Sequence, residues 1–173
     1  MKNAGCVFTR FHWQQDTGIF DWCDENGLLV QEEIPYWGSP KKATALQVNL
    51  AKQHADDMVH YHSHHPSIIC WGVGNELGAK TKQTIGYVDE MYKYFKSIDS
   101  SRLVNYVSNT LHYRTLFQKD DAALHGDIAM WNEYLGLWLK CKDVKKTIIE
   151  THNSCGNMPS MVCLLYTSPS PRD

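Results

Sequence analysis

Short apolar runs recur along this chain at intervals near 30 residues, and this spacing restricts the fold more than any other feature of the sequence. The runs carry no charge, which is typical of strands that are buried on both faces of a parallel sheet. They lie at residues 7–8, 28–30, 68–73, 103–107, 128–131 and 160–162. A strand, a helix and the next parallel strand together occupy about 30 residues, so the spacing predicts βαβ units.

The segments between these runs place apolar residues three or four positions apart, which is the period of an amphipathic helix. Such residues stand at positions 48, 51, 55 and 58, at 85, 88, 92, 95 and 98, and at 144, 148 and 155. Ser39-Pro40 is predicted to start the first helix, and Gly156 to end the third. The pattern predicts an α/β fold. Because a complete (β/α)₈ barrel takes about 250 residues, either a small doubly wound sheet or a barrel lacking strands at both ends remains open.

Composition excludes several classes of partner. The 43% apolar content is that of an ordinary globular domain, and the net charge of −2 gives no reason to expect nucleic acid as a partner. No apolar run approaches the roughly 20 residues that cross a bilayer, so we expect no membrane partner. The six cysteines form no C-x-x-C pair, which favours buried thiols over a disulfide or zinc framework. We expect no cofactor and no metal, and localisation and oligomeric state stay open.

Several predicted strands end in polar side chains, where a parallel barrel carries its chemistry. These are Arg10 and His12, Glu32 and Glu33, Asn75 and Glu76, Ser108 and Asn109, and Asn132 and Tyr134. A carboxylate at the end of an apolar strand is partly desolvated, as a general acid requires, and Glu76 has this setting. Asn75 beside it is an amide able to bind a substrate hydroxyl. On the residues alone, a role for Glu76 as the cap of the next helix remains equally open.

Three segments decide between these interpretations. Residues 65–76, with the sequence HPSIICWGVGNE, resemble the acid/base strand of glycoside hydrolase family 2. Residues 23–33 resemble the second helix and third strand of that family, and residues 127–134 resemble its sixth strand with an N-x-Y pattern. The resemblance runs in order over nearly all of residues 1–162. It implies a partial (β/α)₈ TIM barrel that spans about strands 2 to 7.

The resemblance also implies roles for single residues. Glu76 would protonate the glycosidic oxygen and then act as base toward water, while Asn75 would hold the sugar 2-hydroxyl. Tyr134 would donate its phenol to the nucleophile, and Asn132 would support the end of the sixth strand. In the family the nucleophile follows the seventh strand. Residues 158–162 look like the approach to that motif, so we predict that the nucleophile is not in this chain.

The second barrel strand departs from the family. The family shows Arg-x-x-His, whereas this chain has Arg10-Phe11-His12, which leaves the role of Arg10 unsettled. Both residues remain candidates for substrate binding. Among the aromatic residues we favour Trp131 and Trp13 for substrate contact, because they lie near strand ends.

Four histidines lie close together at positions 60, 62, 64 and 65, before the acid/base strand. They could suggest a metal site. Alternation by two does not place ligands on one face of a helix, however, so we interpret them as solvated side chains at a helix end.

Residues 163–173 break with the preceding composition. They can be encoded by a DNA string that resembles a transposon-type sequencing adapter, so we assign residues 1–162 to an incomplete barrel domain and 163–173 to a non-native tail. The longer parent is then expected to be a retaining β-glycosidase acting on a terminal β-linked sugar, and this chain alone to be inactive.

The resemblance favours β-galactosidase-like activity, with β-glucuronidase or β-mannosidase as alternatives. A rival from another class is a non-catalytic carbohydrate-binding barrel. A nucleotide-binding domain is set aside because the Gly-rich phosphate loop that it needs is missing.

Overall fold

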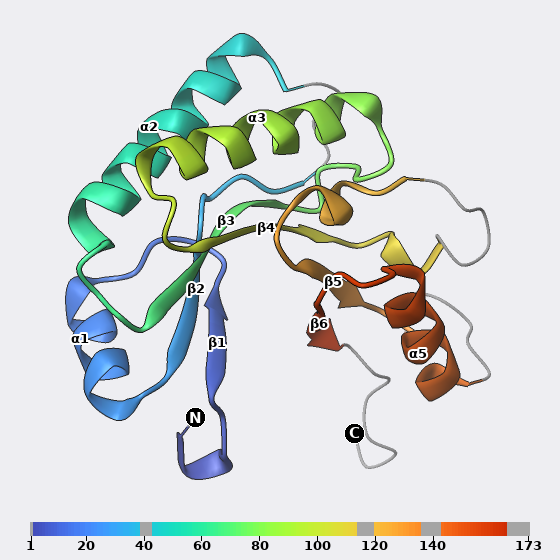
Figure 1. Cartoon of the computed structure of the whole chain (residues 1–173), viewed down its shortest axis with the longest axis horizontal. Helices are drawn as coiled ribbons and strands as arrows, with labels where there is room; N and C mark the ends of the chain where they lie inside the picture. The colour runs from blue at the N-terminus through green and yellow to red at the C-terminus, as the bar shows by residue number, and fades with distance from the viewer. Residues whose placement is uncertain (1, 39–42, 114–119, 136–142, 166–173) are drawn as a thin grey trace.

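The computed structural model describes residues 2–38, 43–113, 120–135 and 143–165. Six parallel strands form one curved sheet, and each strand pairs with the next along the chain. The strands are β1 (Phe8–Phe11), β2 (Leu29–Glu33), β3 (Ile68–Asn75), β4 (Leu103–Ser108), β5 (Ala129–Glu133) and β6 (Ser160–Leu165). All six predicted apolar runs therefore belong to or adjoin strands, and the partial barrel predicted from the sequence is confirmed (Figure 1).

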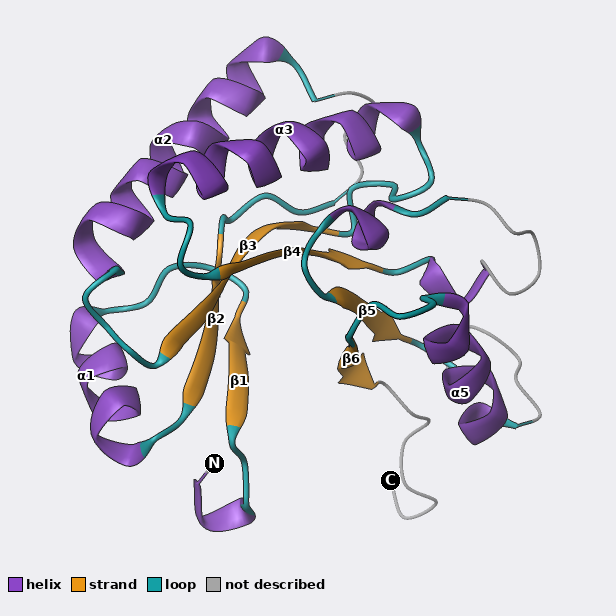
Figure 2. Ribbon diagram, in the orientation of Figure 1, coloured by secondary structure: helices purple, strands orange, loops and turns teal. Residues whose placement is uncertain are grey.

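The helices lie outside the curved sheet (Figure 2). They are α1 (Thr17–Asn26), α2 (Ala45–His62), α3 (Lys82–Ile98) and α5 (Val144–Ser154), with 3₁₀ turns η1 (Lys2–Ala4), η2 (Leu111–Tyr113) and η3 (Ala122–His125). A side-chain cap starts each of the four α-helices, and on α2 Thr44 and Gln47 form a capping box. The three helices predicted from apolar spacing are confirmed. Ser39-Pro40 lies outside the described residues, but α2 begins only at Ala45 after its N-cap Thr44, so the predicted helix start was wrong. No described helix is both long and apolar enough to cross a membrane.

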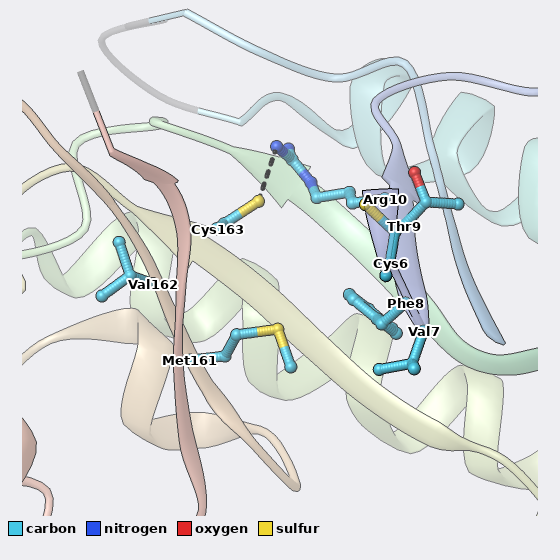
Figure 3. Close-up of a pocket in the computed structure, with 9 residues that line it drawn as sticks. Cys6, Val7, Phe8, Thr9, Arg10, Met161, Val162 and Cys163 are labelled. Carbon is cyan, nitrogen blue, oxygen red and sulfur yellow. Dashed lines mark hydrogen bonds between the residues drawn. The ribbon is translucent and has the colours of Figure 1, made fainter. Parts of the chain in front are cut away.

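The sheet ends at β1 on one side and at β6 on the other (Figure 1). A cavity of about 620 Å³ lies between them, lined by residues 5–10 and 161–163 (Figure 3). One contact crosses it, from Arg10 Nη1 to Cys163 Sγ at 3.3 Å. Strand β6 continues to Leu165, so its last three residues belong to the segment that the sequence assigns to the tail.

Two histidines that the sequence analysis interpreted as solvated are buried, so that prediction was wrong for His62 and His65. His62 Nδ1 lies 2.9 and 3.0 Å from the two carboxylate oxygens of Glu32. His65 Nδ1 lies 2.7 Å from Asp24 Oδ2, and Asp24 Oδ1 accepts the amide of Ser67 at 2.8 Å. These contacts tie α1, α2 and β2 to the start of β3, so the histidines act as internal partners for carboxylates.

The Glu32–His62 pair makes stability depend on pH. Burial raises the pKa of Glu32 from 4.5 to about 8, so the folded state favours its protonated form. Burial, then the neighbouring His65 and His64, lower the pKa of His62, which keeps that ring neutral. A group with a raised pKa contributes stability that is complete below its unfolded value and is lost as pH rises through its folded value.

Replacement of Glu32 by Gln should remove this loss, because the amide cannot ionise. We expect the free energy of unfolding of the wild type to fall relative to Glu32→Gln as pH rises from 5 to 8. Urea denaturation followed by tryptophan fluorescence measures both variants across this range. If the free energies of unfolding of the two variants change in parallel with pH, folding does not raise the pKa of Glu32.

Candidate active site

Glu76 follows the last residue of β3 and has a φ of 54°. This left-handed conformation costs a residue with a Cβ about 1 to 2 kcal/mol, so the surrounding structure must hold it. Two hydrogen bonds do so: the Glu76 amide donates to Val107 O at 2.9 Å, and the Leu77 amide donates to the buried Tyr106 hydroxyl at 2.6 Å. The backbone of the predicted acid/base is therefore fixed from strand β4.

The Glu76 carboxylate is held on one oxygen. Oε1 accepts a hydrogen bond from Tyr134 Oη at 2.6 Å and another from Asn132 Nδ2 at 2.6 Å. Among the described residues, Oε2 is reached only by Asn109 Nδ2 at 3.5 Å. Burial, and then the bond to Glu76, raise the pKa of the Tyr134 phenol, so it remains a donor. The resemblance predicted that Tyr134 donates to the nucleophile, whereas in this structure its partner is Glu76.

Asn75 lies beside Glu76 with its amide orientation determined. Its Oδ1 accepts from Arg10 Nη2 at 2.9 Å and from Asn132 Nδ2 at 3.0 Å. Both partners are obligatory donors, so the oxygen must face them. Among the described residues no group accepts from Asn75 Nδ2, which leaves this donor available to a ligand.

Arg10 reaches Asn75 because Glu33 holds it. Arg10 Nε donates to Glu33 Oε2 at 2.8 Å and Nη2 to Oε1 at 2.6 Å, the two-pronged geometry of a strong guanidinium–carboxylate pair. Burial, the largest single effect, lowers the pKa of Arg10, but the charge and hydrogen bonds of Glu33 together with the contact to Cys163 outweigh it and raise the pKa. His12 Nδ1 lies 2.9 Å from Glu33 Oε1. The structure thus joins Arg10, His12, Asn75 and Glu76 in one group, although Arg10 lies one residue closer to His12 than the family pattern has it.

The two tryptophans favoured for substrate contact differ in placement. Trp131 is 1% exposed and packs in the core, where its Nε1 donates to Glu133 Oε2 at 3.2 Å. This burial argues against the predicted substrate contact, because strand alternation places Trp131 on the face opposite to Asn132, which contacts Asn75 and Glu76. Trp13 is half exposed and stacks on the His12 ring with a centroid distance of 4.5 Å.

The sequence identifies Glu33 and Asn109 as polar residues at strand ends, but it predicts no function for either of them at the site. Glu33 is fully buried and contacts both Arg10 and His12, and Asn109 donates a hydrogen bond to Oε2 of Glu76 at 3.5 Å. The available signal was position: each stands where a parallel strand ends, at the same edge as Glu76.

Comparison with known proteins identifies the family to which this chain belongs. Residues 1–162 match the family described as glycosyl hydrolases family 2, TIM barrel domain. The chain belongs to this family of glycosidases.

Two relatives are β-glucuronidases. One, from Bacteroides fragilis, is 32% identical over 116 residues, covering 63% of this chain and 17% of the relative. The other, from Rattus norvegicus, is 26% identical over 130 residues, covering 74% of this chain and 19% of the relative. This chain therefore spans less than a fifth of the length of these relatives.

Solved structures show the same fold. A GH2 β-galacturonidase from Eisenbergiella tayi bound to galacturonate has a TM-score of 0.81 at 24% identity, covering 93% of this chain and 29% of that one. A β-glucuronidase from Bacteroides uniformis has a TM-score of 0.77 at 25% identity, covering 92% of this chain and 20% of that one.

The positive φ of Glu76 has a measurable energetic consequence. Glu76→Gly and Glu76→Ala both remove the carboxylate, so a comparison of the two isolates the backbone. We expect the glycine variant to be more stable by about 1 kcal/mol, because glycine adopts φ of 54° without the Cβ penalty. Urea denaturation of the two variants gives this difference. An alanine variant of equal or greater stability would show that the conformation is unstrained.

Proposed function

We propose that Glu76 is the acid/base of a retaining β-glycosidase whose substrates are β-glucuronides. The asymmetry of its carboxylate supports this role most strongly. Oε1 receives two strong hydrogen bonds, so a proton on Glu76 belongs on Oε2, which Asn109 alone approaches in the described part of the chain. A carboxyl group held by one oxygen and free to deliver a proton from the other meets the geometric requirement for protonating a glycosidic oxygen.

Asn75 is suited to the sugar. Its Nδ2 is directed away from Arg10 and Asn132, and a hydrogen bond from it to the 2-hydroxyl would strengthen as the ring gains oxocarbenium character. Retention also needs a second carboxylate about 5 to 5.5 Å from the first. We propose that this nucleophile follows β6 in a longer protein. The pairing of β6 with β5, in which Val162 lies beside Trp131, supports this, because the chain after β6 then leaves the sheet at the edge where Asn132 contacts Glu76. The chain of residues 1–173 would then be inactive alone.

The choice of sugar changes from the sequence analysis, which favoured β-galactosides. The relatives from Bacteroides fragilis and Rattus norvegicus are β-glucuronidases, which supports the alternative that the resemblance left open. β-Galacturonides are a second candidate class, because the chain folds like a GH2 β-galacturonidase bound to galacturonate. In the longer protein, aryl β-glucuronides, β-galacturonides, β-galactosides and β-mannosides can be compared directly. Highest kcat/KM on a β-galactoside or β-mannoside would contradict the uronide proposal.

Replacement of Glu76 by Gln tests the acid/base role. General acid catalysis contributes about 10² to 10⁴ in rate, so kcat/KM on an alkyl β-glucuronide, which reports the step that expels the leaving group, should fall by that factor. The loss should be smaller on a 4-nitrophenyl β-glucuronide, whose leaving group needs little protonation to depart. Steady-state kinetics on both substrates give the two ratios.

Glu150→Gln is the matched control, because this carboxylate is half exposed on α5 and pairs only with Lys146 in the described structure. It should leave both rates unchanged. Equal losses on the alkyl and aryl substrates in Glu76→Gln would contradict a proton-donor role. Measurable sugar binding without any hydrolysis by the wild type would favour the non-catalytic alternative.

A further inference from the structure

A row of buried polar side chains lies on the inner face of the sheet, beneath the proposed site. Gln31 Nε2 donates to Glu33 Oε2 at 3.0 Å, and Asn105 Nδ2 donates to Gln31 Oε1 at 3.0 Å. Gln31, Glu33 and Asn105 are all 0% exposed. The row runs from Asn105 on β4 to Gln31 and Glu33 on β2 and ends at Arg10 on β1. Gln31 therefore holds Glu33 from the side opposite to Arg10.

Gly72 on β3 makes room for this row. It is the register partner of Glu33, and a Cβ there would lie 2.7 Å from Glu33 Cγ and 2.7 Å from Gln31 Nε2. Contacts this short do not occur, so any larger residue would displace Glu33 or Gln31. The apolar β3 strand therefore leaves space at Gly72 that the side chains of Gln31 and Glu33 occupy.

Glu33 cannot itself serve as a free nucleophile. Oε1 lies within hydrogen-bonding distance of Arg10 and His12, and Oε2 accepts from Arg10 and Gln31. A carboxylate bound at both oxygens is held in place and has no exposed lone pair to attack a sugar carbon. Any effect of Glu33 on the reaction must therefore act through the side chains that it binds, Arg10 and His12.

We propose that Glu33 is a positioning residue that sets the substrate-facing amide of Asn75 through Arg10. Glu33 fixes the plane of the Arg10 guanidinium, and Arg10 Nη2 then donates to Asn75 Oδ1, which turns Nδ2 toward the sugar. This inference rests on the proposed function, since it assigns a role in sugar recognition. A buried ion pair with only a structural role would not need to end on a side chain of the site.

The variant Glu33→Gln tests the inference in the longer protein. The amide keeps one acceptor but loses the charge and the second acceptor, so the Arg10 fork can no longer be held at both prongs. We expect kcat on an aryl β-glucuronide to fall about 10- to 100-fold with KM changed less than about threefold, because misplaced binding groups act mainly in the transition state.

Glu32→Gln is the matched control. Glu32 is the neighbouring residue on the same strand, is equally buried, and faces His62 on the other side of the sheet. It should stay within about twofold of wild type near pH 7. If Glu33→Gln behaves like this control, the positioning role is wrong. If the wild type hydrolyses no β-glycoside, the proposed function fails and this inference fails with it, so the two failures are distinguishable.

A double-mutant cycle tests the route through Asn75. Glu33→Gln should cost little further rate in an Asn75→Ala background if both act on one contact. Rate losses that multiply would show independent effects and overturn the route. Arg10→Lys keeps the charge but loses the planar fork, so it should reproduce the kcat loss even if Glu33→Gln fails to fold. Normal kcat in Arg10→Lys would equally overturn the inference.

Discussion

Parallel pairing of each strand with the next is the constraint on which the rest of this structure depends. It brings the carboxyl ends of the strands to one edge, so residues far apart in sequence meet there. Arg10 from β1, Glu33 from β2, Asn75 from β3 and Asn132 from β5 form a continuous set of hydrogen bonds for this reason. A one-residue slip in any strand would turn its polar end into the helix layer and break the set.

The charges of Arg10 and Glu33 at this edge offset each other before any ligand arrives. Arg10 and Glu33 neutralise each other through two hydrogen bonds, and the neutral amides of Asn75 and Asn132 carry the contacts onward to Glu76. Glu76 is thereby left as the carboxyl group with an accessible oxygen. The left-handed backbone at Glu76 is held in the same region, because residues of β4 bind the amides of Glu76 and Leu77.

Much of the fold could be predicted from the sequence, because apolar periodicity is a local signal that burial enforces. The six strands, three of the helices and the pairing of Asn75 with Glu76 at a strand end were all accessible in this way. The partners of side chains were not. Burial of His62 and His65 depends on Glu32 and Asp24, which lie about 30 to 40 positions away, and helical spacing says nothing about such contacts.

The burial of Trp131 and the role of Glu33 were missed for a related reason. Trp131 and Glu33 both stand near strand ends, so proximity to the edge could not tell which of them faces the site. Gly72 held the missing signal: a glycine opposite Glu33 in the register leaves the space that the side chains of Glu33 and Gln31 occupy. That register is known only once the strands are paired, and sequence alone does not give it.

The most direct test of this account is covalent labelling of the longer protein with a glucuronide-configured cyclophellitol aziridine, followed by digestion and tandem mass spectrometry. Such a reagent esterifies the nucleophile of a retaining glycosidase. The account predicts a label on a carboxylate that follows β6, outside residues 1–162, with Glu76 unmodified. A label on Glu76 would make it the nucleophile and contradict the assignment of acid/base.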